Sequence, residues 1–299
     1  MATHRTFSAL LTATAAKYPK HLALKSPFQP GFTPLTYGDL SRKTVGLSTW
    51  LSAYGYERGD LLVSDLPNVS ENLILQLACN RIGVTYGMVK DVESMAKIKK
   101  VKGSVPGTED SFLWDVILPV PGVGGDFVSE LLEGEQLDNF YNEDEEEGDE
   151  NVPHGNYNNS NYTNEDLLLH AADAALKMDL SPEDSICVGV TLCHPFGIGS
   201  GIGSAIFSGS SIVLPAVGGI RGCGVPSERA AATLTCLKEH SCTHLFMDTH
   251  TLKALPQNES KLPNFKGGAV KIGSGATFLK ETQEYGGINL QCVGKESRK

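Results

Sequence analysis

The chain has no Lys or Arg between Gly103 and Leu176, although this stretch contains 18 Asp and Glu residues. The rest of the chain has 17 acidic and 25 basic residues, so the formal charges of the two parts are about −18 and +8. A polyacidic segment repels phosphate, which excludes nucleic acid as its partner. We expect other protein subunits to be the partners, bound through the acidic segment 133–150 and through basic faces elsewhere.

Acidic residues are also absent from the beginning of the chain, where the first one is Asp39. The opening MATHRTFSALLTATAAKYPKHLALKS is rich in Thr, Ser, Ala and basic residues, which is the composition of a mitochondrial transit peptide. The same residues are equally compatible with a native first helix. Location in the mitochondrion and location in the cytoplasm therefore both remain open.

No C-x-x-C pair occurs among the seven cysteines. An odd, scattered set of thiols fits a reducing compartment and predicts neither a disulfide framework nor a zinc site. His240 and His244 have the spacing of helical metal ligands, but CTHLFM is typical of a strand, which separates them. We expect no metal.

Charged residues are missing again from Ser185 to Ile220, which raises the question of a membrane span. Seven Gly and five Ser residues between Gly197 and Ile220 make transfer into lipid unfavourable, so we expect no transmembrane span. Within this stretch GIGSGIG resembles a nucleotide loop, but Ser204 stands where G-x-G-x-x-G requires its third glycine, and no P-loop Lys follows. We interpret this segment as a closely packed helix.

The residues that are present predict an α/β fold of β-sheets flanked by helices. Strand-like and helix-like runs alternate in residues 1–102 and again in 162–299, which we expect to be two α/β subdomains. Residues 103–161 contain little to bury and are predicted to be an acidic insertion or loop. Thr163 and Asp166 have the spacing of a capping box at the start of a helix.

Four stretches resemble, in the same order, the large N-terminal domain of the AMP-forming acyl-CoA synthetase superfamily. They are LTYGDLSRKTVGLSTWLSAYGYERGDLLVSDLPNVSENLILQLACNRIGV, LCHPFGIGSGIGSAIFSGSSIVLP, KEHSCTHLFMDTHTLKAL and VKIGSGATFLKE. The similarity covers most of residues 7–90 and 163–299. It implies the acyl-CoA synthetase-like N-terminal fold. Family members activate a carboxylate with ATP as an acyl-adenylate and pass the acyl group to a thiol.

The family's phosphate loop reads close to SGTTGxPKG and precedes a short strand ending in Thr-His. Aligning Thr163 and Asn164 with that ending places NVPHGNYNN, residues 151–159, over the loop. Only Gly155 agrees, and Asn158 falls where the Lys belongs. In the family, small residues and a cation help the backbone amides of this loop to hold phosphate. Here bulky polar residues take their place, directly after the acidic run EDEEEGDE. The resemblance therefore predicts a degenerate phosphate loop and no ATP cofactor.

Other family sites survive in part. His194 and Gly197 in LCHPFG, and Gly273, Ser274, Gly275 and Ala276 in GSGA, match segments that line the acyl and nucleotide pocket. Gly294 and Glu296 in LQCVGKES match remnants of Q-G-Y-G-x-T-E, and the family's C-terminal domain with its catalytic Lys is expected to be absent. These residues predict a vestigial pocket without catalytic residues; purely structural roles for the His and Gly residues are the alternative.

Three hypotheses follow. The first is a pseudoenzyme, a catalytically inactive acyl-CoA synthetase-like chain that serves as a structural subunit of a larger complex in the mitochondrion or the cytoplasm. The second is a regulatory protein that binds an acyl or CoA ligand in the pocket around His194. The third is an acid-CoA ligase completed by another chain, which would still need a phosphate loop from elsewhere.

Overall fold

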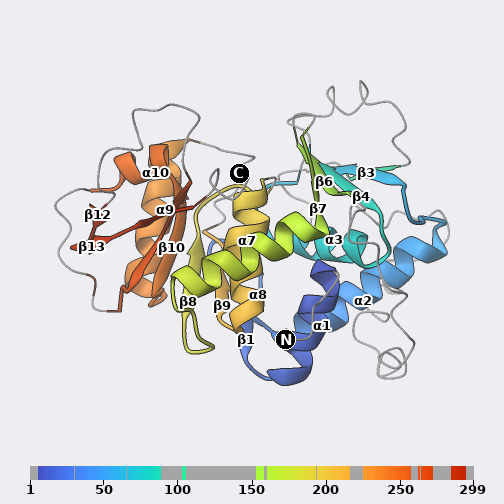
Figure 1. Cartoon of the computed structure of the whole chain (residues 1–299), viewed down its shortest axis with the longest axis horizontal. Helices are drawn as coiled ribbons and strands as arrows, with labels where there is room; N and C mark the ends of the chain where they lie inside the picture. Colours follow the sequence, from blue (N-terminus) through green and yellow to red (C-terminus); the bar gives the residue numbers. More distant parts are fainter. Residues whose placement is uncertain are drawn as a thin grey trace.

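The computed structural model describes residues 6–29, 31–64, 66–88, 103–105, 153–157, 160–192, 194–215, 225–256, 262, 264–271 and 284–293. Helices and strands alternate along most of this length (Figure 1). The first half contains α1 (Phe7–Lys17), β1 (Leu22–Lys25), β2 (Leu35–Thr36), α2 (Tyr37–Ala53), β3 (Leu61–Ser64), α3 (Ser70–Arg81), β4 (Thr85–Met88), β5 (Gly103–Val105), β6 (Pro153–Tyr157) and β7 (Ser160–Thr163).

The second half continues the alternation and supplies most of the larger sheet. Its elements are α7 (Asn164–Lys177), β8 (Ser185–Val188), the π-helical segment η2 (Phe196–Gly203), α8 (Ser204–Ser208), β9 (Ser211–Val213), α9 (Pro226–Glu239), β10 (His244–Asp248), α10 (Thr249–Ala254), β11 (Gly267–Lys271), β12 (Glu284–Tyr285), β13 (Ile288–Asn289) and β14 (Gln291–Val293).

The seven-stranded sheet has the order β14-β11-β10-β8-β9-β1-β2, and all its strands are parallel except β2, which runs antiparallel to β1. Its central strands are apolar on both faces, and β8 and β10 are almost completely buried. This composition is expected for a parallel sheet covered by helices on both sides. The five-stranded sheet has the order β5-β3-β4-β6-β7, in which only the β6–β7 pair is antiparallel.

The two sheets do not follow the predicted boundaries at 102/103 and 161/162. Strands β1 and β2 join the sheet of the second half, because β1 pairs with β9. Strands β5, β6 and β7 lie within or next to the predicted insertion 103–161, yet they extend the sheet of the first half. Long-range strand pairing therefore crosses the division made from composition.

The glycine-rich stretch is a helix, as predicted, and not a nucleotide loop. Segments η2 and α8 run between α7 and the seven-stranded sheet, and every residue of η2 is buried. A methyl group on Gly199 would lie 3.1 Å from the Cβ atom of His170 on α7, so the missing side chain permits this close approach. No helix in the described part of the chain is long and apolar enough to cross a membrane.

The first residues of the helices differ in how they are capped. Thr163 caps α7 in the predicted capping box, in which the Asp166 carboxylate accepts a hydrogen bond from the Thr163 backbone N–H at 2.9 Å. Helix α9 begins at Pro226 without a side-chain cap, because Val225 occupies the cap position and the fixed φ of proline suits the first helical residue. Helix α1 has Thr6 as its cap and buries Phe7, Leu10 and Leu11, which favours the native-helix interpretation of the opening segment.

Candidate functional site

The strand order points to one edge of the larger sheet. After β8 the chain crosses through η2 and α8 to β9, and it returns through α9 to β10 on the other side of β8. Gly201 of η2 faces Val188, whereas Thr233 of α9 faces Gly189, so the two connections cover opposite faces. Ligands of open parallel sheets bind beyond the carboxyl ends of the strands at such a switch point. The residues at the carboxyl ends of β8, β10 and β11 therefore form the candidate site.

His194 follows β8 and is half-buried at this edge. Its Nδ1 atom accepts a hydrogen bond from the Phe196 backbone N–H at 3.1 Å, and its carbonyl oxygen accepts from Gly197 and Ile198 at 2.8 and 3.0 Å. Since Nδ1 is an acceptor, the neutral ring carries its proton on Nε2. Burial, together with the nearby charges of Lys271 and His170, lowers the pKa of His194 to about 4.

Two polar side chains from the first half of the chain hold the segment that leads to His194. Asn68 receives the Leu192 N–H on its Oδ1 atom at 3.1 Å and donates to the Val190 carbonyl at 3.3 Å. Gln76, in the middle of α3, donates to the Leu192 carbonyl at 3.2 Å. The signal for Gln76 in the sequence was a polar residue inside a buried helix, which needs a hydrogen-bond partner, whereas Asn68 precedes α3 and had no such signal.

His170 and Lys271 are close enough for their charges to act on His194, although neither belongs to a motif. His170 is on α7, with its Nδ1 atom 3.4 Å from the Ser200 hydroxyl of η2. Lys271 ends β11 and is the register partner of Asp248 at the end of β10. Phe246, two residues before Asp248 on β10, contacts Phe196 of η2.

Asp248 forms an ion pair with Arg229 of α9. Their Oδ2 and Nη1 atoms are 2.6 Å apart, and the side chains are only 15% and 5% exposed. The other carboxylate oxygen of Asp248 accepts the Thr251 N–H at 2.8 Å and thereby caps α10. We call His170, His194, Arg229, Asp248 and Lys271 the carboxyl-end cluster.

Protonation of His194 is expected to destabilise the fold. Its folded-state pKa of about 4 lies below the ordinary value of 6.5, so stability is complete above pH 6.5 and is lost as the pH falls towards 4. The loss should reach about 3 kcal/mol, at 1.36 kcal/mol per pKa unit. Urea unfolding of the wild type and of His194→Gln across this range checks this, because the variant should lose less stability. An equal pH dependence of the free energy of unfolding in the two proteins would contradict this prediction.

Several predicted pocket residues lie outside the described residues, namely Asn158, Gly273, Ser274, Gly275, Ala276, Gly294 and Glu296. Their proposed roles stay predictions. Gly197 lies in the first turn of η2, next to His194.

The predicted phosphate loop needs a correction. Gly155 was expected in a loop spanning 151–159, but it lies in β6, where it pairs with Tyr86 of β4 and with Tyr162 of β7. The register partners Tyr157 and Ser160 close the hairpin, so only residues 158 and 159 connect its strands. Backbone hydrogen bonding to β4 and β7 favours a strand here despite the polar composition.

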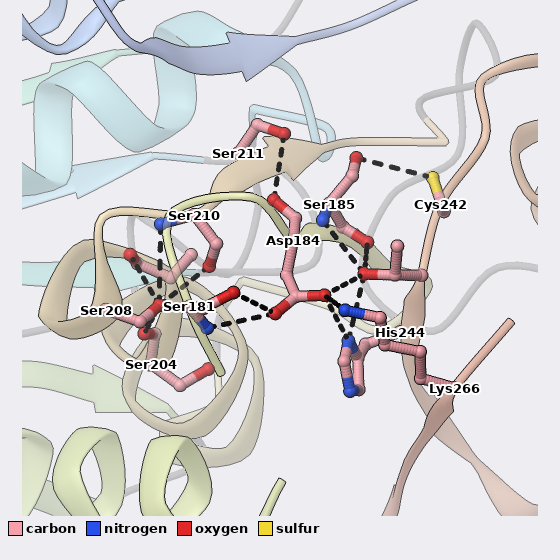
Figure 2. Close-up of polar contacts among 12 residues, drawn as sticks. Ser181, Asp184, Ser185, Ser204, Ser208, Ser210, Ser211, Cys242, His244 and Lys266 are labelled. Carbon is pink, nitrogen blue, oxygen red and sulfur yellow. Dashed lines mark hydrogen bonds and ion pairs between the residues drawn. The ribbon is translucent and has the colours of Figure 1, made fainter. Parts of the chain in front are cut away.

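A second polar cluster lies at the opposite, amino ends of β8, β10 and β11 (Figure 2). Asp184 is 2% exposed and accepts hydrogen bonds from Lys266 Nζ at 2.6 Å, Thr243 Oγ1 at 2.9 Å, and the Ser181 N–H and hydroxyl at 2.9 and 2.8 Å. Burial raises the pKa of Asp184, but these donors outweigh it and bring the pKa to about 2. Asp184 therefore stays ionised and joins β8 to the starts of β10 and β11.

Comparisons with known proteins identify the fold. No protein-family model and no curated protein matches the sequence. Among solved structures, apo MbtA of Mycobacterium smegmatis matches 91% of this chain with a TM-score of 0.65 and 16% identity. O-succinylbenzoate coenzyme A synthetase (MenE) of Bacillus subtilis matches 88% with a TM-score of 0.63 and 16% identity. The N-terminal domain of FACL13 from Mycobacterium tuberculosis matches 89% with a TM-score of 0.64 and 14% identity.

The chain thus has the α/β fold of the N-terminal domain of AMP-forming acyl-CoA synthetases and adenylation enzymes. It spans 53% of the MbtA chain, 56% of the MenE chain and 69% of the FACL13 domain. The fold expected from the resemblance is confirmed.

Proposed function

We propose that this chain is a pseudoenzyme of the acyl-CoA synthetase fold that acts as a structural subunit of a larger protein complex. The observation that carries the proposal is the hairpin in which two residues connect β6 to β7. Strand β7 ends at Thr163 before α7, which is where the family's strand after the phosphate loop ends. A phosphate cradle needs several consecutive backbone amides around the anion, and a two-residue connection cannot supply them.

The head of α7 supports the same proposal. The first amides of a helix are the usual place for a phosphate group. Here the Thr163 hydroxyl accepts the Asp166 N–H at 3.2 Å, and the Asp166 carboxylate stands at the same end of the helix. Asn164 is buried and accepts the Phe7 N–H at 3.0 Å. A carboxylate at this position would repel the triphosphate of ATP.

Purified protein is expected to catalyse no ATP–pyrophosphate exchange with a panel of aliphatic, aromatic and amino acids. MenE of Bacillus subtilis, assayed with O-succinylbenzoate, is the positive control. The thermal midpoint should also be unchanged by ATP with Mg²⁺, because the two-residue connection between β6 and β7 offers no phosphate cradle to bind them. Exchange above background with any acid, or acyl-adenylate detected by mass spectrometry, would refute the proposal.

The subunit role includes the acidic segment 133–150 and basic faces as contact surfaces, in either the mitochondrion or the cytoplasm. Affinity purification from native cells, followed by sizing and mass spectrometry, tests this part. Recovery in a defined complex, with binding lost when the acidic residues are changed to Asn and Gln, supports it. Recovery only as a free monomer would contradict it.

A second candidate function is the binding of a small ligand at the carboxyl-end cluster without catalysis. It is favoured by the position of His194 at the switch point, held through Asn68 and Gln76. Such a protein would report ligand levels to its complex. A ligase completed by another chain is the weakest alternative, because that chain would have to supply the phosphate loop.

A further inference from the structure

Among the described residues, Cys79, Cys187, Cys236 and Cys242 are free cysteines with buried side chains. Three of them belong to one region of the fold. Cys187 lies in β8, Cys236 in α9, and Cys242 in the turn that leads from α9 into β10. Cys187 and Cys236 are completely buried, and Cys242 is 1% exposed. We call these three residues the thiol cluster, whereas Cys79 lies apart from them in α3.

The face of β8 that α9 covers explains why two of these thiols meet. Successive side chains of a strand point to opposite faces, so Ser185, Cys187 and Gly189 share one face of β8. Helix α9 packs on this face, because a Cβ atom on Gly189 would lie 2.9 Å from the Thr233 hydroxyl oxygen. Cys236 follows Thr233 by about one helical turn. Since α9 leads into the start of β10, this turn of α9 lies towards the amino end of β8, over Cys187.

Cys242 reaches the same place from the turn before β10. The Ser185 hydroxyl donates to the Sγ atom of Cys242 at 3.9 Å (Figure 2), and the Cys187 thiol is hydrogen-bonded to both Cys236 and Cys242. The hydrogen bonds to Cys236 and Cys242, together with burial, raise the pKa of Cys187. The hydrogen bond from Cys187 lowers the pKa of Cys242 against the effect of burial, and the charge of Lys25 acts in the same direction. When the pair ionises, Cys187 therefore keeps its proton and Cys242 carries the thiolate.

Cys242 is also the member of the thiol cluster nearest to solvent. It directly follows Ser241, which is exposed and has a φ of 53°. A positive φ strains a residue that carries a side chain, so the turn between α9 and β10 opens at a lower cost than the strands beside it. Hydrogen peroxide is close to water in size, and it reaches Cys242 through such openings before it reaches Cys187 or Cys236.

We propose that the thiol cluster is a peroxide-sensitive modification site, in which oxidation joins Cys242 to Cys187 as a disulfide. The Cys242 thiolate attacks one oxygen of hydrogen peroxide; an S–O bond forms, the O–O bond breaks, hydroxide leaves, and Cys242 becomes a sulfenic acid. The Cys187 sulfur then attacks the Cys242 sulfur, the S–O bond breaks, and the proton of Cys187 leaves with the hydroxyl group as water. The two sulfur atoms together lose two electrons to peroxide. A thiol reductant restores both thiols by exchange. This site goes beyond the proposed function, and neither depends on the other.

The test is oxidation of the folded full chain with hydrogen peroxide at neutral pH. The remaining free thiols are then blocked with N-ethylmaleimide in urea, and the peptides are mapped by mass spectrometry. A peptide pair linked through Cys187 and Cys242 is expected, and dithiothreitol should separate it. Cys79 is the internal control, because burial raises the pKa of its thiol and it has no part in the cluster. Its oxidation should be at least about tenfold slower than that of Cys242.

Two variants separate the roles of the thiols. Cys187→Ala should stop the reaction at the sulfenic acid of Cys242, which dimedone traps. Cys236→Ala is the matched control, because it removes a buried thiol of the same cluster without removing either partner of the disulfide, and it should leave the linked peptide unchanged. Circular dichroism shows whether each variant folds, and the peptide map of the wild type decides the inference even where a variant does not.

Three results would overturn the inference. They are a wild-type map without the link between Cys187 and Cys242, a link from either residue to Cys236 in its place, and oxidation of Cys79 as fast as that of Cys242. The absence or presence of pyrophosphate exchange has no bearing on this site, so its failure and that of the proposed pseudoenzyme are distinguishable.

Discussion

Replacing Gly197 with alanine is expected to cost at least about 3 kcal/mol of folding free energy. A Cβ atom at this position would lie 2.0 Å from the carbonyl oxygen of Thr191 and 2.9 Å from its carbonyl carbon. Both contacts are with backbone, so no side-chain rotation can relieve them, and the turn from Thr191 to His194 must move. The loss should appear as a lower urea midpoint in circular dichroism, with an unchanged slope.

Gly201→Ala provides the matched control for this prediction. It makes the same substitution four residues later in η2, but the nearest atom to the new methyl group is the Val188 Cγ1 atom at 3.0 Å. A valine side chain can shift by a few tenths of an ångström, and alanine favours helix over glycine by about 1 kcal/mol. We expect the free energy of unfolding to change by less than about 1 kcal/mol. Equal losses in the two variants would show that the Thr191 contact is not the cause.

The same contact explains what the sequence could and could not indicate about GIGSGIG. The composition predicted a closely packed helix, and both the helix and its burial are confirmed. The π-helical geometry and the contact of Gly197 with a backbone carbonyl six residues earlier were not predictable, because they depend on how β8 and η2 meet. The glycine that looks like part of a nucleotide loop makes room for the turn that carries His194.

The alternation of apolar runs also located most of the strands and helices, since each run needs only local periodicity. The hairpin of β6 and β7 escaped prediction because its residues are polar and its partner, β4, lies about 70 positions earlier. The carboxyl-end cluster escaped for a related reason. His170 and Lys271 are single residues without a motif, and only the parallel register of β10 and β11 and the packing of α7 on η2 bring them towards His194.

Polar residues inside α3 form a pattern in the sequence that indicates hydrogen-bonding partners on neighbouring elements. Asn72, Gln76 and Asn80 recur every four residues, and the residues between them are apolar in this almost entirely buried helix. Asn72 accepts from the Tyr86 hydroxyl at 3.0 Å and Gln76 donates to Asn72 at 3.0 Å, while Asn80 donates to Asn164 at 2.6 Å. Buried amides at helical spacing imply a row of partners on neighbouring elements, although the sequence does not identify them.

Asp184→Asn is expected to destabilise the protein by about 3 kcal/mol. Four donors from Ser181, Thr243 and Lys266 converge on the two oxygens of this buried carboxylate. An asparagine amide keeps one oxygen and turns the other acceptor into a donor, so at least one buried donor group is left facing another. The strand starts of β10 and β11 then lose their common attachment to β8. Thermal and urea unfolding measure the loss directly.

Asp39→Asn is the matched control, because Asp39 also accepts hydrogen bonds from a residue three positions earlier, Thr36, but lies near the surface of α2. Its loss should be only about 1 kcal/mol, the usual value of a helix cap.

The pH dependence of the stability difference between the wild type and Asp184→Asn separates the contribution of the negative charge from that of packing. Asp184 has its pKa lowered from 3.8 to about 2, so the charge-dependent part of the advantage over Asp184→Asn is complete above pH 3.8 and declines as the pH falls towards 2. This part amounts to about 2 kcal/mol at 1.36 kcal/mol per pKa unit. A difference between the two proteins that stays constant down to pH 2 would mean that packing around Asp184, and not its charge, holds the amino ends of the strands together.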